Sequence, residues 1–151
     1  MREGAKIIKL LLVEDNPDDI LMAQRALKEA KVICRLWIVK DGQAALDFLQ
    51  HRGQYGDFAA APRPELLLLD INLPGINGLE VLKKIKEDPD LKRIPAVMFT
   101  ISRREEDIAR GYKYGCNSFV QKPAKFEEFV EVVKQVGLYW GLLNVNENIT
   151  N

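Results

Sequence analysis

The chain has 151 residues, and its 22 lysine and arginine residues balance 22 aspartate and glutamate residues. Zero net charge provides no basic surface for nucleic acid and no reason to expect binding at a membrane surface. Because no apolar stretch approaches the roughly 20 residues of a membrane span and no signal peptide is recognisable, we expect a cytoplasmic protein, with one domain over residues 1–151.

The first half of the chain alternates between strand and helix patterns. Ile7–Val13 is nearly all apolar, as expected of a strand buried on both faces. Asn16-Pro17 predicts a helix start, because asparagine caps helices and proline suits the first helical position. A second strand over Val32–Val39 and a helix around Ala45–Leu49 follow. Residues 52–64 form an irregular stretch that is long for a helix-to-strand connection.

The second half continues the alternation. Its predicted elements are a strand over Leu66–Asp70, a helix from Leu79 to Asp88, a strand over Ile94–Thr100, a helix over Arg104–Tyr112, a strand over Asn117–Gln121 and a helix over Phe126–Val136. This repetition predicts an α/β fold, in which a parallel sheet with right-handed crossovers is covered by helices on both faces.

Short polar segments end or directly follow four of the five predicted strands. They are Glu14-Asp15, Asp70, Thr100 and Lys122-Pro123. The carboxyl ends of parallel strands share one edge of the sheet, where ligands of such folds bind. We therefore expect three carboxylates, a hydroxyl and an ammonium to gather there, as a site for a divalent cation and a phosphoryl group.

The acidic members of this set suit metal-assisted phosphoryl chemistry. A carboxylate such as that of Asp70 can attack phosphorus to give an acyl phosphate, and Mg²⁺ neutralises the phosphoryl oxygens. Mg²⁺ prefers an octahedral shell of oxygens. We expect Asp15 and Asp70 to supply carboxylate ligands, Glu14 to bind through water, and Asn72 to add its backbone carbonyl.

The remaining polar residues have ordinary interpretations beside the functional ones. Lys122 would hold one phosphoryl oxygen as a point charge and Thr100 would donate to another, although a lone lysine is usually a surface residue and a lone threonine often ends a strand. Asp18 and Asp19 are interpreted as first-turn charges that favour the helix dipole, rather than as metal ligands.

Taken together, four segments resemble the receiver domain of response regulators in two-component signalling. They are residues 11–19, 68–78, 97–100 and 118–123, within a matching region from 7 to about 137. The resemblance implies a flavodoxin-like (βα)5 fold, doubly wound, with a five-stranded parallel sheet in the order 2-1-3-4-5. The long loop at 52–64 and the tail at 138–151 resemble the stand-alone receivers that serve bacterial phytochrome-type histidine kinases.

The resemblance also implies a role for each site residue. Asp70 is the phospho-acceptor, Glu14 and Asp15 are the acidic pair, Thr100 is the switch hydroxyl, and Lys122 is the phosphate-sensing lysine before a cis-type peptide to Pro123. Phe119 falls at the position of the switch aromatic, where a core residue is nearly as good an interpretation.

The function implied is a signalling switch rather than an enzyme. A sensor histidine kinase, in the narrower expectation a phytochrome-type one, phosphorylates Asp70 with Mg²⁺. Because no output domain follows, the signal passes by protein interaction or as a homodimer, without nucleic acid or membrane. The apolar cluster between Leu138 and Leu143 fits a partner surface and packing onto the domain equally well.

Three other functions compete with the switch. A phosphohydrolase with an aspartyl nucleophile generally carries a second acid two residues later, where this chain has Asn72. A structural adaptor would not need the intact set of site residues, and a flavin-binding protein of the same fold class would not need clustered acids.

One residue departs from the family pattern. Ile101 follows Thr100, where such domains usually carry a small residue. We hypothesise that this β-branched side chain narrows the approach to the acyl phosphate and slows its hydrolysis.

Overall fold

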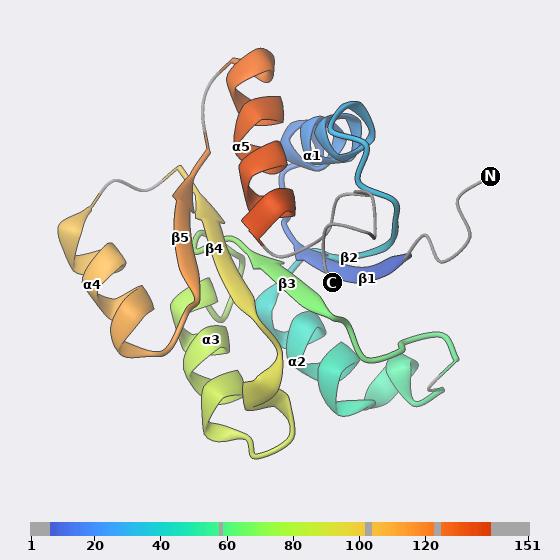
Figure 1. Ribbon diagram of the computed structural model, residues 1–151. Helices are drawn as coiled ribbons and strands as arrows, with labels where there is room; N and C mark the ends of the chain where they lie inside the picture. The colour runs from blue at the N-terminus through green and yellow to red at the C-terminus, as the bar shows by residue number, and fades with distance from the viewer. Residues whose placement is uncertain (1–6, 58, 102–103, 123–124, 140–151) are drawn as a thin grey trace, which may run out of the picture.

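The computed structural model describes residues 7–57, 59–101, 104–122 and 125–139 (Figure 1). Five parallel strands form one sheet in the order β2-β1-β3-β4-β5, which confirms the expected fold class and strand order. The strands are β1 (Ile8–Val13), β2 (Cys34–Val39), β3 (Leu66–Leu69), β4 (Ala96–Thr100) and β5 (Ser118–Gln121). β3 therefore lies at the centre, and β2 and β5 form the two edges.

Helices cover both faces of the sheet, as Figure 1 shows: α1 and α5 lie together on one face, and α2, α3 and α4 on the other. Their bounds are α1 (Pro17–Glu29), α2 (Gly42–Gln50), α3 (Gly78–Glu87), α4 (Glu105–Lys113) and α5 (Phe126–Tyr139). None of the helices in the described part of the chain is both long enough and apolar enough to span a membrane.

The central strand explains the two hydrophobic layers. Successive side chains of a strand point to opposite faces. Leu67 and Leu69 accordingly join the core beneath α2 and α3, while Leu66 and Leu68 join the core beneath α1 and α5. All four leucines are buried, which is why this strand appears in the sequence as an uninterrupted apolar run.

The start of α1 follows the sequence prediction closely. Asn16 caps the helix, and its side-chain oxygen accepts hydrogen bonds from the backbone N–H groups of Asp18 (2.9 Å) and Asp19 (3.1 Å). Pro17 is the first helical residue. The cap fixes the first turn of α1 directly above the end of β1.

The predicted boundaries differ from the structure in a few places. β2 begins at Cys34 instead of Val32, and the irregular stretch at 52–64 contains a short 3-10 turn, η1 (Gly53–Tyr55). A second such turn, η2 (Leu91–Arg93), was not predicted. Of the C-terminal tail, only the backbone through Tyr139 lies within the described residues, as the end of α5. The side chains of the apolar cluster predicted between Leu138 and Leu143 lie outside them.

Candidate functional site

The predicted polar residues lie where four neighbouring strands end. Glu14 and Asp15 directly follow β1, Asp70 directly follows β3, Thr100 is the last residue of β4, and Lys122 directly follows β5. Because β1, β3, β4 and β5 are consecutive and parallel, all of these positions share the carboxyl edge of the sheet. The topology thus brings together residues that are up to 108 positions apart in the chain.

Three carboxylates form a compact acidic cluster at this edge. Glu14, Asp15 and Asp70 each offer a carboxylate oxygen within 4.8 Å of the others. Glu14 and Asp70 are buried and Asp15 is exposed, so the cluster opens to solvent on one side. A set of carboxylate oxygens without histidine or cysteine suits a hard divalent cation such as Mg²⁺ or Mn²⁺.

Asp70 is fixed by its own backbone surroundings. Its backbone N–H donates to the carbonyl of Val13 on β1, at 3.2 Å. Its Oδ1 accepts a hydrogen bond from the backbone N–H of Ile71, at 2.8 Å. These contacts orient the carboxylate at the end of β3 while Oδ2 faces the Lys122 ammonium at 3.4 Å.

Asn72 lies in the tight turn that follows Asp70. The N–H of Leu73 donates to the carbonyl of Ile71 at 3.0 Å, so the turn closes around Asn72. The Asn72 side chain is exposed. Metal binding by its backbone carbonyl stays a prediction.

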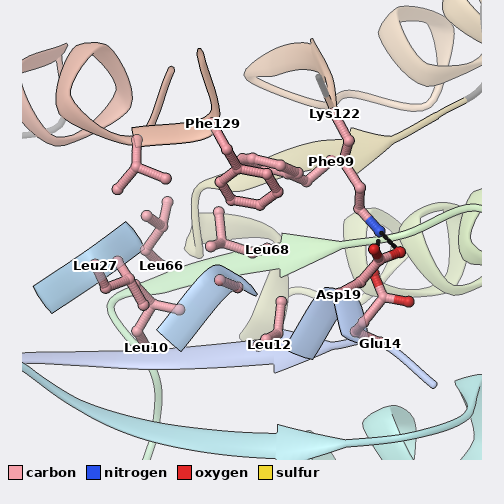
Figure 2. A pocket seen from close by; sticks show the side chains of 12 residues that line it. Leu10, Leu12, Glu14, Asp19, Leu27, Leu66, Leu68, Phe99, Lys122 and Phe129 are labelled. Carbon is pink, nitrogen blue, oxygen red and sulfur yellow. Dashed lines mark hydrogen bonds and ion pairs between the residues drawn. The ribbon is translucent and has the colours of Figure 1, made fainter. Parts of the chain in front are cut away.

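Lys122 reaches across the sheet into the acidic cluster. Its backbone N–H donates to the carbonyl of Thr100 at 2.8 Å, which anchors the residue beside β4. Its Nζ forms ion pairs with Glu14, with Asp19 at 3.2 Å and with Asp70 at 3.4 Å. Figure 2 shows the lysine side chain passing Phe99, with its nitrogen pointing toward the carboxylates of Glu14 and Asp19.

Asp19 is the one member of this group that the sequence did not indicate. It was interpreted as a first-turn helix charge, and it does lie in the first turn of α1. Its ion pair with Lys122 joins residues 103 positions apart. No spacing within α1 signals that contact, since it depends on α1 and the end of β5 meeting at the sheet edge.

Burial and their mutual contact shift the pKa values of Glu14 and Lys122. Burial raises the pKa of Glu14 to about 7, and the nearby charge of Asp70 adds to the increase, although the contact with Lys122 opposes it. Burial lowers the pKa of Lys122, but its contact with Glu14 and the charges of Asp70 and Asp19 outweigh burial, and the net direction is upward. Lys122 is therefore a charged ammonium at neutral pH.

Lys122 and its partners Glu14, Asp19 and Asp70 together form the ion cluster. A small apolar cavity borders this ion cluster. It lies between the sheet and helices α1 and α5 (Figure 2), and its volume is about 20 Å³, room for about one water molecule. Its walls are mostly leucine and phenylalanine, including Leu12, Leu68 and Phe99, and the residues Glu14, Asp19 and Lys122 lie at its border. Apolar walls lower the local dielectric response, which strengthens the ion pairs beside them.

Thr100 and Phe119 complete the predicted set. Thr100 is fully buried at the end of β4, where it pairs with Gln121 of β5. Phe119 is half-buried in β5, and its ring lies against Gly111 of α4. Their switching roles stay predictions, and the cis-type peptide expected at Pro123 lies outside the described residues.

Comparison with known proteins agrees with this geometry. The model of the response regulator receiver domain family matches residues 10–134. Response regulator Rcp1 of Synechocystis sp. is 40% identical over 131 residues, which is 87% of each chain.

Solved structures point to the same group of proteins. The phosphorylated cyanobacterial phytochrome response regulator RcpA is 41% identical, with a TM-score of 0.82 over 89% of this chain and 94% of that one. The Mn²⁺-bound form of Rcp1 is 40% identical, with a TM-score of 0.81 over 92% of this chain and 97% of that one. The family model spans most of the chain and these relatives cover it at about 40% identity, so the chain belongs to the response regulator receiver domain family.

Proposed function

We propose that this chain is a phospho-accepting signalling switch in which Asp70 receives a phosphoryl group from a sensor histidine kinase. The observation that carries the proposal is the meeting of Asp70 with an acidic pair and a buried ammonium at one sheet edge. Each component has a task in phosphoryl transfer, and none of them is explained by the packing of the core.

The transfer itself is a displacement at phosphorus. A carboxylate oxygen of Asp70 attacks the phosphorus of a phosphohistidine, and the new O–P bond forms as the N–P bond breaks. The bonding electron pair returns to the imidazole nitrogen of the kinase, and the product on this chain is an aspartyl phosphate. The fixed orientation of Asp70, held by the Ile71 N–H, lowers the entropic cost of reaching this geometry.

The cluster of Glu14, Asp15 and Asp70, with the Asn72 carbonyl, would hold the Mg²⁺ ion. Bound there, Mg²⁺ neutralises charge on the phosphoryl oxygens. Lys122 pairs with a further phosphoryl oxygen, and its short distance from Asp70 supports this role. Thr100 donates its hydroxyl to the third oxygen.

Phosphorylation would then act as a population shift. Contacts from Thr100 and Lys122 to the phosphoryl group exist only in the phosphorylated state, so they favour the conformation that brings these residues inward. Phe119 links β5 to α4 through its packing against Gly111, and this contact supports a relay to the α4–β5–α5 surface. A protein partner or a second copy of the chain reads that surface.

The kinase partner is proposed from the relatives. RcpA is described as a phytochrome response regulator, and at 41% identity it supports a phytochrome-type histidine kinase as the donor. The protein catalyses at most its own phosphorylation and slow dephosphorylation, and we place it in the cytoplasm.

The test is incubation with acetyl phosphate and Mg²⁺, followed by intact mass and elution volume. We expect the wild type to gain one phosphoryl group only when Mg²⁺ is present, and Asp70→Asn to gain none. An earlier elution of the phosphorylated protein would identify dimerisation as the output. A phosphoryl group that Asp70→Asn also acquires would contradict the assignment, and rapid turnover of small phosphoesters would favour a phosphohydrolase.

A further inference from the structure

Asp19 belongs to the ion cluster around Lys122 but not to the acidic cluster that is predicted to hold the metal ion. Its Oδ2 lies 3.2 Å from Lys122 Nζ, whereas the three acids whose oxygens converge as a cation site are Glu14, Asp15 and Asp70. The Lys122 side chain is 6% exposed and that of Asp19 is 30% exposed, so the pair lies at the border of the buried site.

The other two partners of Lys122 are also predicted to hold the cation. Glu14 and Asp70 both contact the ammonium, and both belong to the acidic cluster. A cation held by these acids, directly or through water, competes with Lys122 for the negative charge of the same two carboxylates. Of the three carboxylates paired with Lys122, Asp19 alone lies outside that competition.

The surroundings make this competition costly. The Lys122 side chain is buried and passes an apolar cavity with walls such as Leu12 and Phe99, so a charge left without a partner there is poorly solvated. A carboxylate that keeps the ammonium neutralised removes part of that cost. It also reduces the repulsion between Lys122 and an arriving divalent cation.

The position of Asp19 is fixed by the helix and not by the site. Its backbone N–H donates to the cap residue Asn16, and the first turn of α1 presents the carboxylate toward Lys122. Asp18 precedes it in the same turn, donates to the same cap oxygen and is exposed. The two aspartates share charge and helix position, and the Lys122 ion pair distinguishes Asp19.

We infer that Asp19 is a positioning residue that holds the Lys122 ammonium when the divalent cation takes Glu14 and Asp70. It thereby raises cation affinity and keeps Lys122 available for the phosphoryl group. The inference rests on the proposed function for its purpose, but cation binding alone is enough to test it.

The test is a double-mutant cycle on the full chain, with the dissociation constant for Mg²⁺ measured by calorimetry. Asp19→Asn is expected to weaken Mg²⁺ binding roughly three- to tenfold, because Lys122 then pairs more strongly with the predicted metal ligands Glu14 and Asp70. Asp18→Asn is the matched control, since it removes the same charge from the same helix turn, and we expect less than about a twofold change from it.

The second arm removes the lysine. In a Lys122→Met background, Asp19→Asn should weaken Mg²⁺ binding no more than Asp18→Asn does, because the coupling runs through the ammonium. Circular dichroism checks the fold of each variant, and Asp19→Ala serves as the second variant if Asp19→Asn does not fold.

Two results would overturn the inference: equal effects of Asp18→Asn and Asp19→Asn, or an Asp19→Asn loss that persists undiminished without Lys122. A wild type that binds no Mg²⁺ would overturn it together with the metal site. Failure of the proposed function is separate, because a chain that accepts no phosphoryl group still reports the cycle through cation binding.

Discussion

Ile101 is the residue that we expect to depart from the family pattern, and it lies directly after β4 at the carboxyl edge of the sheet. It directly follows the buried Thr100, and 64% of its surface is exposed. An isoleucine that contributes little to the core still occupies volume next to the group that Thr100 would hold. We therefore retain the proposal that it limits the approach of water to the aspartyl phosphate.

Replacing this side chain should shorten the lifetime of the phosphorylated state. Ile101→Ala is expected to speed hydrolysis roughly three- to tenfold, which corresponds to about 1 kcal/mol of activation free energy. The measurement is the decay of the phosphorylated mass after acetyl phosphate is removed. Ile101→Val keeps the β-branch and should decay at nearly the wild-type rate. Equal rates for the wild type and Ile101→Ala would rule out the shielding role.

Among the secondary-structure elements, α3 begins in close backbone contact with Asp70. Gly78 is its first residue, and a Cβ there would lie 1.9 Å from the Asp70 carbonyl oxygen. The N–H of Gly78 also donates to the carbonyl of Ile71 at 2.9 Å. Glycine at this position therefore lets the start of α3 brace the backbone that carries the phospho-acceptor.

Adding one methyl group should break this contact. Gly78→Ala is expected to lower the free energy of unfolding by about 1–3 kcal/mol, because a Cβ against backbone cannot be relieved by a side-chain rotation. It should also slow phosphoryl uptake, since Asp70 is displaced. Urea unfolding and the acetyl phosphate assay measure the two effects.

A second glycine provides the control for that change. Gly56 has right-handed helical backbone angles, and the nearest atom to an added Cβ is 3.6 Å away. Gly56→Ala should be neutral or stabilising by up to about 1 kcal/mol. If both variants lost the same stability, the loss at Gly78 would reflect glycine replacement in general and not the contact with Asp70.

These elements also show what the sequence was able to predict. The strand order and the edge position of Asp70 follow from runs such as Leu66–Leu69, which need only local pattern and the rule that parallel strands end on one side. The sequence predicted that α3 begins at Leu79, and the close approach at Gly78 was not predicted. Whether a glycine allows backbone contact or merely turns the chain depends on the partner segment, which local pattern does not reveal.

The ion cluster was predictable in its members but not in its pairing. The sequence brought Lys122 to the site as a phosphate ligand, whereas the structure pairs it with three carboxylates at once. The contact with Asp19 depends on how α1 lies relative to the end of β5. These two segments are far apart in the chain and meet only when the layers of the fold pack together. Such a contact is a tertiary property, and a helix-terminal aspartate carries no mark of it.

For the whole molecule, the acidic cluster lowers the free energy of unfolding in the absence of a metal ion. Glu14, Asp15 and Asp70 repel one another at less than 4.8 Å. Lys122 pairs with Glu14 and Asp70 and so offsets part of that repulsion. Asp15 is exposed, and a cation held by the three acids would compensate its charge.

This balance predicts opposite effects of one substitution with and without metal. Without a divalent cation, Asp15→Asn should unfold at the same temperature as the wild type or higher, because it removes a repelling charge. With Mg²⁺ at a hundred times the dissociation constant, the free energy of unfolding of the wild type should rise by about 2.7 kcal/mol. Each kcal/mol corresponds to a rise of roughly 2–4 °C in the unfolding temperature. Asp15→Asn should gain much less. Thermal unfolding with EDTA and with Mg²⁺ measures both, and Asp18→Asn should retain most of the wild-type gain. An Mg²⁺ gain in Asp15→Asn equal to that of the wild type would place the cation elsewhere.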